Sequence, residues 1–186
     1  MRLLHTLALS LALLAPGTLM AADWPAQPVT LVVPYPPGGN VDSAARIIAP
    51  GLEKELGQPI VVENRAGAGG MIAAESVKKA DADGYTLFMA ANGPLLFSPM
   101  TMGRPDAYNW KADFTPIGSV SLVPMVLEVR ADLDIKTLPE LLEKAKSDGL
   151  LMASPGAGTT NHLAAELLKS ETGGDWRIVH YKGNAP

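Results

Sequence analysis

The strongest constraint on the fold is a repeated alternation of short apolar runs with longer helical segments. The first run, Val29–Val33, reads VTLVV and has one polar side chain among its five residues. A continuous run of this length is typical of a strand buried on both faces of a parallel sheet. A Pro/Gly loop and a segment with helical periodicity follow it. This order, repeated along the chain, predicts an α/β protein with largely parallel sheets.

The same patterns place the remaining elements. Further strands are predicted at residues 60–63, 85–90, 117–121, 125–129, 150–154 and 178–181, and helices at 40–56, 71–80, 137–148 and 160–170. Residues 91–115, rich in Pro, Gly and Asn, are predicted to be irregular. Asn40 is expected to cap the first helix, and Pro50 to kink or divide it. Thr137 and Glu140 have the spacing of a capping box.

The first 22 residues have the layout of a secretory signal peptide. Arg2 and His5 precede the apolar run 7–14, and the small residues Ala21 and Ala22 follow. That run is too short to cross a bilayer as a helix. We therefore expect cleavage near Ala22, export to the periplasm and a mature protein that is not embedded in the membrane. An uncleaved membrane anchor is the alternative.

Composition excludes several classes of function. Hydrophobic residues make up 47% of the chain and charged residues 18%, which is enough to form a core. The formal net charge of −4 argues against nucleic acid as a partner, because neutralising phosphates needs clustered Lys and Arg. The chain has no cysteine, which excludes disulfides, thiolate catalysis and Cys-based zinc sites.

Three loops share a design that suits an anion. They are residues 34–42, 154–162 and 181–186, and their glycines are Gly38, Gly39, Gly156, Gly158 and Gly183. Each follows a predicted strand, and ligands of parallel α/β proteins bind at the carboxyl ends of strands. Glycine lets backbone N–H groups approach a ligand, and a helix N-terminus favours negative charge. The alternative is that these glycines only make tight turns.

The residues now assembled resemble the substrate-binding receptors of tripartite tricarboxylate transporters, also called Bug receptors. The motifs that carry the resemblance are PPGG-x-x-D, ENR-x-GAGG, DGYTL and S-x-G-x-G-T, and they occur in the family's order. The resemblance implies a two-lobed Venus-flytrap receptor of the type II periplasmic class. It also implies that residues 23–122 form a first lobe and 123–186 part of a second, with residues 1–22 as signal peptide. Family members run past residue 186, so the second lobe is expected to be incomplete here.

The resemblance also implies the ligand and its site. The ligands of such receptors are small carboxylates, namely di- and tricarboxylates, amino acids and aromatic acids, delivered to membrane transporter subunits. Taken together, the motifs and the three loops give the candidate ligand-binding residues Tyr35, Gly38, Gly39, Asn40, Asp42, Ser154, Ala157, Gly158, Thr159, Thr160 and Gly183. Two roles stay open for Asp42: compensation of the helix dipole, or recognition of a ligand amino group.

Other candidate chemistry is weaker. His162 and Glu166 have a helical spacing that could bind metal, but two ligands without a third favour His162 as a hydrogen-bonding residue at the helix start. Ile72 occupies the third glycine position of a dinucleotide fingerprint, so this pattern fails and no cofactor is expected. No metal is expected either. Few titratable groups lie in the loops, which favours a binding protein over an enzyme. The protein is expected to be a monomer. The alternatives are a secreted α/β enzyme acting on a small organic acid and a receptor for a signalling system.

Overall fold

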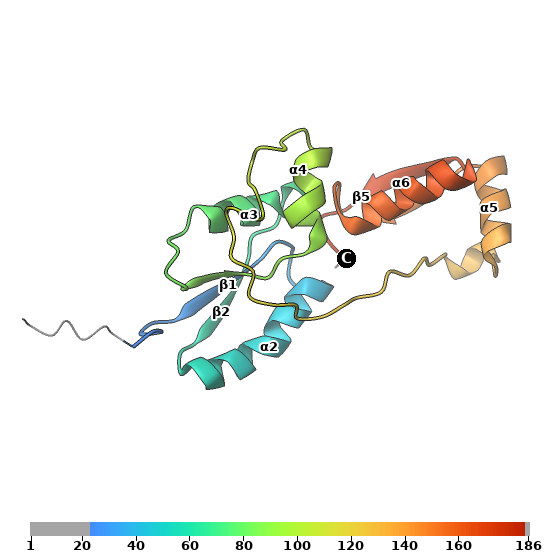
Figure 1. Ribbon diagram of the computed structural model, residues 1–186. Coiled ribbons are helices and arrows are strands. Elements are labelled where there is room, and N and C mark those ends of the chain that lie inside the picture. Colours follow the sequence, from blue (N-terminus) through green and yellow to red (C-terminus); the bar gives the residue numbers. More distant parts are fainter. Residues whose placement is uncertain (1–22, 185–186) are drawn as a thin grey trace, which may run out of the picture.

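The computed structural model describes residues 23–184 and contains two small parallel sheets (Figure 1). The first has the strand order β2-β1-β3, and the second pairs β4 with β5. The strands are β1 (Val29–Val33), β2 (Ile60–Asn64), β3 (Thr86–Phe88), β4 (Leu150–Ser154) and β5 (Trp176–His180). In Figure 1 each sheet lies with its own helices, and a long extended segment connects the two groups. The predicted α/β class with parallel sheets is confirmed.

The first sheet is covered on both faces by helices. Strand β1 is central, and its Val29, Val32 and Val33 are fully buried. Helix α2 (Asn40–Leu56) packs through Ala45 and Ala49 on the face of the sheet that carries Val29, Leu31 and Val33 of β1. Helix α3 (Met71–Lys78), preceded by the short helix η2 (Ala68–Gly70), lies across the sheet from α2 in Figure 1. This arrangement accounts for the unbroken apolar sequence of β1.

Helix α2 has the predicted length but not the predicted cap. Gly39 is its N-cap, with no side-chain hydrogen bond, and Asn40 is its first residue. The expectation that Asn40 caps the helix is therefore wrong. Pro50 lies inside the helix without dividing it. At the other end, the left-handed Gly57 donates its N–H to the Glu53 carbonyl, which is the predicted stop.

The segment predicted as irregular contains two short helices. Helix η3 (Gly93–Phe97) is a π-helical turn, and α4 (Ser98–Thr101) follows it directly. Pro94 and Pro99 are the second residues of these two helices, in the first turn, where the missing N–H costs no helical hydrogen bond. Both helices pack near η2 and α3, and α4 is seen beside α3 in Figure 1.

Residues 116–130 correct the strand prediction. Strands were expected at 117–121 and 125–129, but the segment is extended without being paired in a sheet. Its large apolar side chains are exposed, with Leu122 at 94% and Val126 at 74%. A strand needs a neighbour to satisfy its N–H and C=O groups, and none of the described strands pairs with this segment. The boundary predicted between residues 122 and 123 falls inside it.

The second sheet is built mainly as predicted. After the turn η4 (Ala131–Leu133), helix α5 (Leu138–Ser147) begins with a complete capping box. Its Leu141 and Ala145 pack against Trp176 of β5 to form a small core. Helix α6 (Thr160–Thr172) connects β4 to β5. None of the helices in residues 23–184 is long and apolar enough to cross a membrane. The predicted signal peptide lies outside the described residues.

Candidate ligand-binding site

Two loops of the predicted site leave the carboxyl ends of parallel strands and enter long helices. The first joins β1 to α2, and the second joins β4 to α6. Gly38 (φ 89°) and Gly158 (φ 74°) are in the left-handed region, which explains glycine at these two positions. The first N–H groups of each helix have no partner within the helix, so both loops end in a cluster of N–H donors.

A polar cluster centred on Asp42 holds the first loop. The Asp42 carboxylate accepts hydrogen bonds from the Gly38 N–H (2.8 Å), the Asn64 amide (2.9 Å) and the Arg46 guanidinium (3.0 Å). The Asn64 amide also donates to the Tyr35 carbonyl at 2.9 Å. Asn64 reaches both ends of the loop because it pairs in register with Val33, the residue before the loop's first proline.

Charge and burial define the state of Asp42. Its side chain is 4% exposed, and Arg46 lies one helical turn away. The hydrogen bond from Arg46, supported by those from Gly38 and Asn64, lowers the pKa of Asp42 to about 2 against the effect of burial. The carboxylate is thus ionised and fully engaged by protein donors. This geometry favours a loop-holding role for Asp42 over recognition of a ligand amino group, and it also occupies the N–H of Gly38.

The second loop is held by its own hydroxyl and imidazole groups. The buried Thr159 is the N-cap of α6: its Oγ1 accepts the His162 N–H and donates to the Gly156 carbonyl at 2.8 Å. The Nδ1 of His162 accepts the Gly158 N–H at 3.1 Å. The predicted role of His162 at the helix start is confirmed. In residues 23–184 there is no group of three His, Cys, Asp or Glu side chains that could hold a metal.

Hydroxyl groups differ in whether they remain available to a ligand. Ser154 is buried and its Oγ is within hydrogen-bond distance of both the N–H and the carbonyl of Gly156. Thr159 is engaged in the cap. Thr160, the first residue of α6, is half-buried, and no hydrogen bond of its hydroxyl is found within the described part of the chain. Thr160 is therefore the hydroxyl of this loop that is left for a ligand.

The loops from the two sheets meet. Asn184 donates from its amide to the Asn40 side chain at 3.0 Å, and a Cβ atom at Gly183 would lie 2.9 Å from Pro36. Ala157 faces the first lobe through its carbonyl, as does Gly158. Of the predicted residues, Gly39 is buried at the start of α2 and Asn40 is exposed at the contact. Burial raises the pKa of Tyr35 to about 12, so its phenol stays neutral.

A cavity of about 350 Å³ lies where the second sheet ends. It is lined by Ala153, Ser154, Pro155, Asn161, Tyr181, Gly183 and Asn184. Its polar side chains, those of Ser154, Asn161, Tyr181 and Asn184, carry no formal charge and can provide hydrogen bonds. Only Ser154 and Gly183 of this lining are in the predicted site. Asn161 and Asn184 lie inside the predicted loops 154–162 and 181–186, next to their glycine-rich parts, which is the signal that would have found them.

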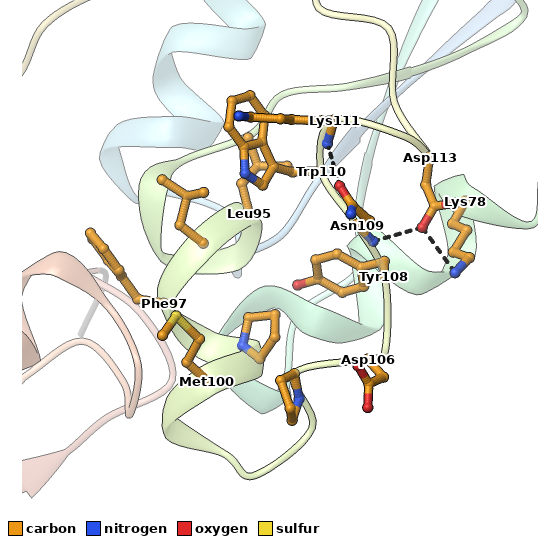
Figure 2. Close-up of a pocket in the computed structure, with 13 residues that line it drawn as sticks. Lys78, Leu95, Phe97, Met100, Asp106, Tyr108, Asn109, Trp110, Lys111 and Asp113 are labelled. Carbon is orange, nitrogen blue, oxygen red and sulfur yellow. Dashed lines mark hydrogen bonds and ion pairs between the residues drawn. The ribbon is translucent and has the colours of Figure 1, made fainter.

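A larger cavity, of about 770 Å³, is lined by Lys78 of α3 and by residues between 95 and 113, and it shares no residue with the predicted site. Leu95, Phe97, Met100 and Trp110 contribute apolar side chains to its wall. Figure 2 shows an ion pair among the lining residues, in which the Lys78 Nζ lies 2.9 Å from the Asp113 carboxylate. Sequence reasoning did not find this cavity, because its wall comes from the segment predicted to be irregular.

Comparison with known proteins places the chain in a family. The family model described as tripartite tricarboxylate transporter family receptor matches residues 44–186. The chain belongs to this family. Protein BugT of Bordetella pertussis is 36% identical over the whole of this chain, which covers 58% of BugT. Membership of a receptor family agrees with the prediction of a binding protein rather than an enzyme.

Solved structures confirm the fold as that of an α/β periplasmic binding protein. The structure of Rpa4515 from R. palustris with adipate is 38% identical with a TM-score of 0.78, over 87% of this chain and 54% of that one. MatC from Rhodopseudomonas palustris with bound malate is 34% identical with a TM-score of 0.78, over 86% and 55%. The periplasmic binding protein BugD has 31% identity and a TM-score of 0.70, over 88% and 55%. The chain thus spans about half the length of the relatives it matches.

Proposed function

We propose that the protein is a periplasmic receptor that captures a small carboxylate for a tripartite tricarboxylate-type transporter. The observation that carries the proposal is the convergence of two loops, 34–40 and 154–160, which come from different sheets and both end at helix N-termini. The Tyr35 hydroxyl of the first loop and the Thr159 Cα of the second both lie within 3.3 Å of a Cβ atom placed at Gly93, and Asn40 also contacts Asn184 of the loop after β5. Two such ends favour an anion placed between them. The relatives that bind adipate and malate support a carboxylate as the ligand.

The chemistry proposed for the site is binding by backbone N–H groups and one hydroxyl. Gly39 and Asn40 present N–H groups at the start of α2, and Thr160 and Asn161 present theirs at the start of α6. Thr160 adds its hydroxyl. The 350 Å³ cavity is in the range of small-ligand sites and would take the remainder of the ligand. Binding between two lobes couples capture to closure, which suits a receptor that hands its ligand to a membrane transporter.

The proposal is tested on the full-length gene product with a panel of carboxylates. The panel contains adipate, malate, citrate, benzoate and aspartate, and binding is measured by thermal shift and calorimetry. Replacing Thr160 by Val keeps the shape of the side chain and removes its donor. We expect about tenfold weaker binding, since a hydrogen bond to a charged group contributes roughly 1.5–3 kcal/mol. Thr115→Val, at an exposed position outside the loops, is the control.

Two results would contradict the proposal. If no member of the panel raised the melting temperature, carboxylate capture would be wrong. If a carboxylate bound equally well to Thr160→Val and to the wild type, the ligand would lie away from the start of α6.

A further inference from the structure

Ser98 is a buried polar residue that contacts the second loop, which joins β4 to α6. It lies at the start of α4 and is 0% exposed. Its Oγ is 2.9 Å from the carbonyl oxygen of Gly69 and 3.3 Å from that of Gly158. A hydroxyl has one proton, so it donates to either carbonyl in turn. One acceptor is in its own lobe, and the other is in the loop that precedes α6.

Glycines surround this hydroxyl and allow the two backbones to approach closely. A Cβ atom at Gly69 would lie 2.5 Å from the Ala157 carbonyl oxygen, and one at Gly158 would lie 2.7 Å from the Cα of Ser98. At Gly93 a Cβ atom would lie 3.1 Å from the Cα of Thr159. The second loop therefore approaches the backbone of residues 69, 93 and 98 closely, because glycine at positions 69, 93 and 158 leaves no side chain between the segments.

We propose that Gly69, Gly93 and Ser98 form a loop seat that positions residues 156–159 for ligand binding. The inference rests on the proposed function, because the seat acts through the loop and touches no ligand itself. Seating the loop fixes the start of α6, and so fixes the N–H groups and the Thr160 hydroxyl relative to the first loop. Tyr35 joins the two parts, since its hydroxyl lies 3.3 Å from where a Cβ atom at Gly93 would be.

The seat also gives a role to the glycines of the ENR-x-GAGG motif. Gly69 (φ 61°) turns the chain so that its carbonyl meets Ser98. Gly70 (φ 91°) has Pro94 and Pro34 against it, at 2.4 Å and 2.9 Å from a Cβ atom. A side chain at either position would displace the backbone that supports the loop. The motif therefore shapes the surface on which the other lobe closes, rather than binding a nucleotide.

Gly93 offers the sharpest test of the seat. Its φ is not in the left-handed region, so Gly93→Ala adds a methyl group without backbone strain. Gly118→Ala is the matched control, because a Cβ atom there meets nothing within 4 Å and its φ is also not left-handed. Ser98→Ala is the second variant and removes the hydroxyl while adding no atoms.

The first readout is the distance between the lobes, measured in the full-length protein without ligand. Residues 1–186 contain no cysteine, so the labelling sites within them are those introduced by Lys54→Cys on α2 and Ser170→Cys on α6, both exposed positions. Any cysteine outside these residues is first replaced by serine. We expect pulsed-dipolar distances to lengthen in Gly93→Ala and to stay unchanged in Gly118→Ala. Circular dichroism and melting of each variant establish that the lobes remain folded.

The second readout is affinity for the panel of carboxylates. We expect Gly93→Ala to weaken every ligand that binds by about tenfold, and Ser98→Ala by about fivefold, the loss of one neutral hydrogen bond. An equal loss of affinity for all ligands indicates that these residues position the loop. Direct contact with the ligand would instead change the affinities unequally and so alter selectivity. Unchanged spin-label distances, or lengthened distances with unchanged affinity, would overturn the loop seat. If no carboxylate bound while the distances lengthened, the proposed function would fail and the seat would stand as a contact between lobes.

Discussion

At the scale of single residues, the site depends on side chains that support loops rather than reach for a ligand. The sequence predicted Asp42 from its place in the PPGG-x-x-D motif, but one of its hydrogen-bond partners is distant in the sequence. Asn64 is 22 residues away and comes beside it only through the register of β1 and β2. A motif places a residue near a site, whereas the contacts of its carboxylate are decided by which strand lies next to it.

Replacing Asp42 by Asn tests this supporting role. The variant loses charge-assisted hydrogen bonds to Gly38, Arg46 and Asn64, so we expect the free energy of unfolding to fall by about 1.5–3 kcal/mol in urea titrations. Affinity should fall alike for aspartate and for amine-free dicarboxylates. Asp81→Asn, at an exposed position, is the control. A loss of affinity for aspartate alone would show that the Asp42 carboxylate binds the amino group of the ligand.

The same carboxylate predicts how stability depends on pH. Its pKa is lowered from an ordinary value of 3.8 to about 2 in the folded protein. A lowered pKa gives stability that is fully present above pH 3.8 and is lost as pH falls toward 2. The difference in unfolding free energy between the wild type and Asp42→Asn should therefore shrink across this window. Urea titrations at pH 5, 4, 3 and 2.5 measure it, and a constant difference would contradict the assignment.

At the scale of elements, the local sequence signals for helix ends predicted the structure correctly, whereas the prediction of two strands from apolar runs was wrong. Helix α5 begins at its predicted capping box, and α2 ends at Gly57, because caps and left-handed glycines act within one turn. The strands predicted at 117–121 and 125–129 did not form, because a strand also requires a neighbour at the right distance. The apolar residues of this segment favour burial against other apolar groups. Their periodicity does not show which neighbouring strand, if any, would pair with the segment.

Hydrogen exchange on the 186-residue chain checks this segment. Amides of residues 116–130 have no sheet partner among the described strands, so we expect them to exchange within seconds. Amides of β1, which pairs with strands on both sides, should be protected for far longer under the same conditions. Strong protection of residues 116–130 would show that the segment is paired in solution.

At the scale of the whole molecule, the sequence predicted the class of fold, the parallel sheets and the loops that meet. It did not predict how the loops are held or which surfaces they rest on. Asn64, Gly93 and Ser98 were missed because their roles come from contacts between segments 22 to 66 residues apart. The larger first-lobe cavity in Figure 2 was missed for the same reason, and it is the clearest competing location for a ligand.

Amide chemical shifts of the full-length protein, followed by NMR as a carboxylate is added, test the central claim most directly. If one carboxylate lies between the two loops, the N–H signals of Gly39, Asn40, Thr160 and Asn161 should shift together with a single dissociation constant. Hydrogen bonding to a carboxylate should move them downfield. Shifts confined to the first-lobe cavity, around Leu95 to Asp113, with the starts of α2 and α6 unchanged would contradict the account.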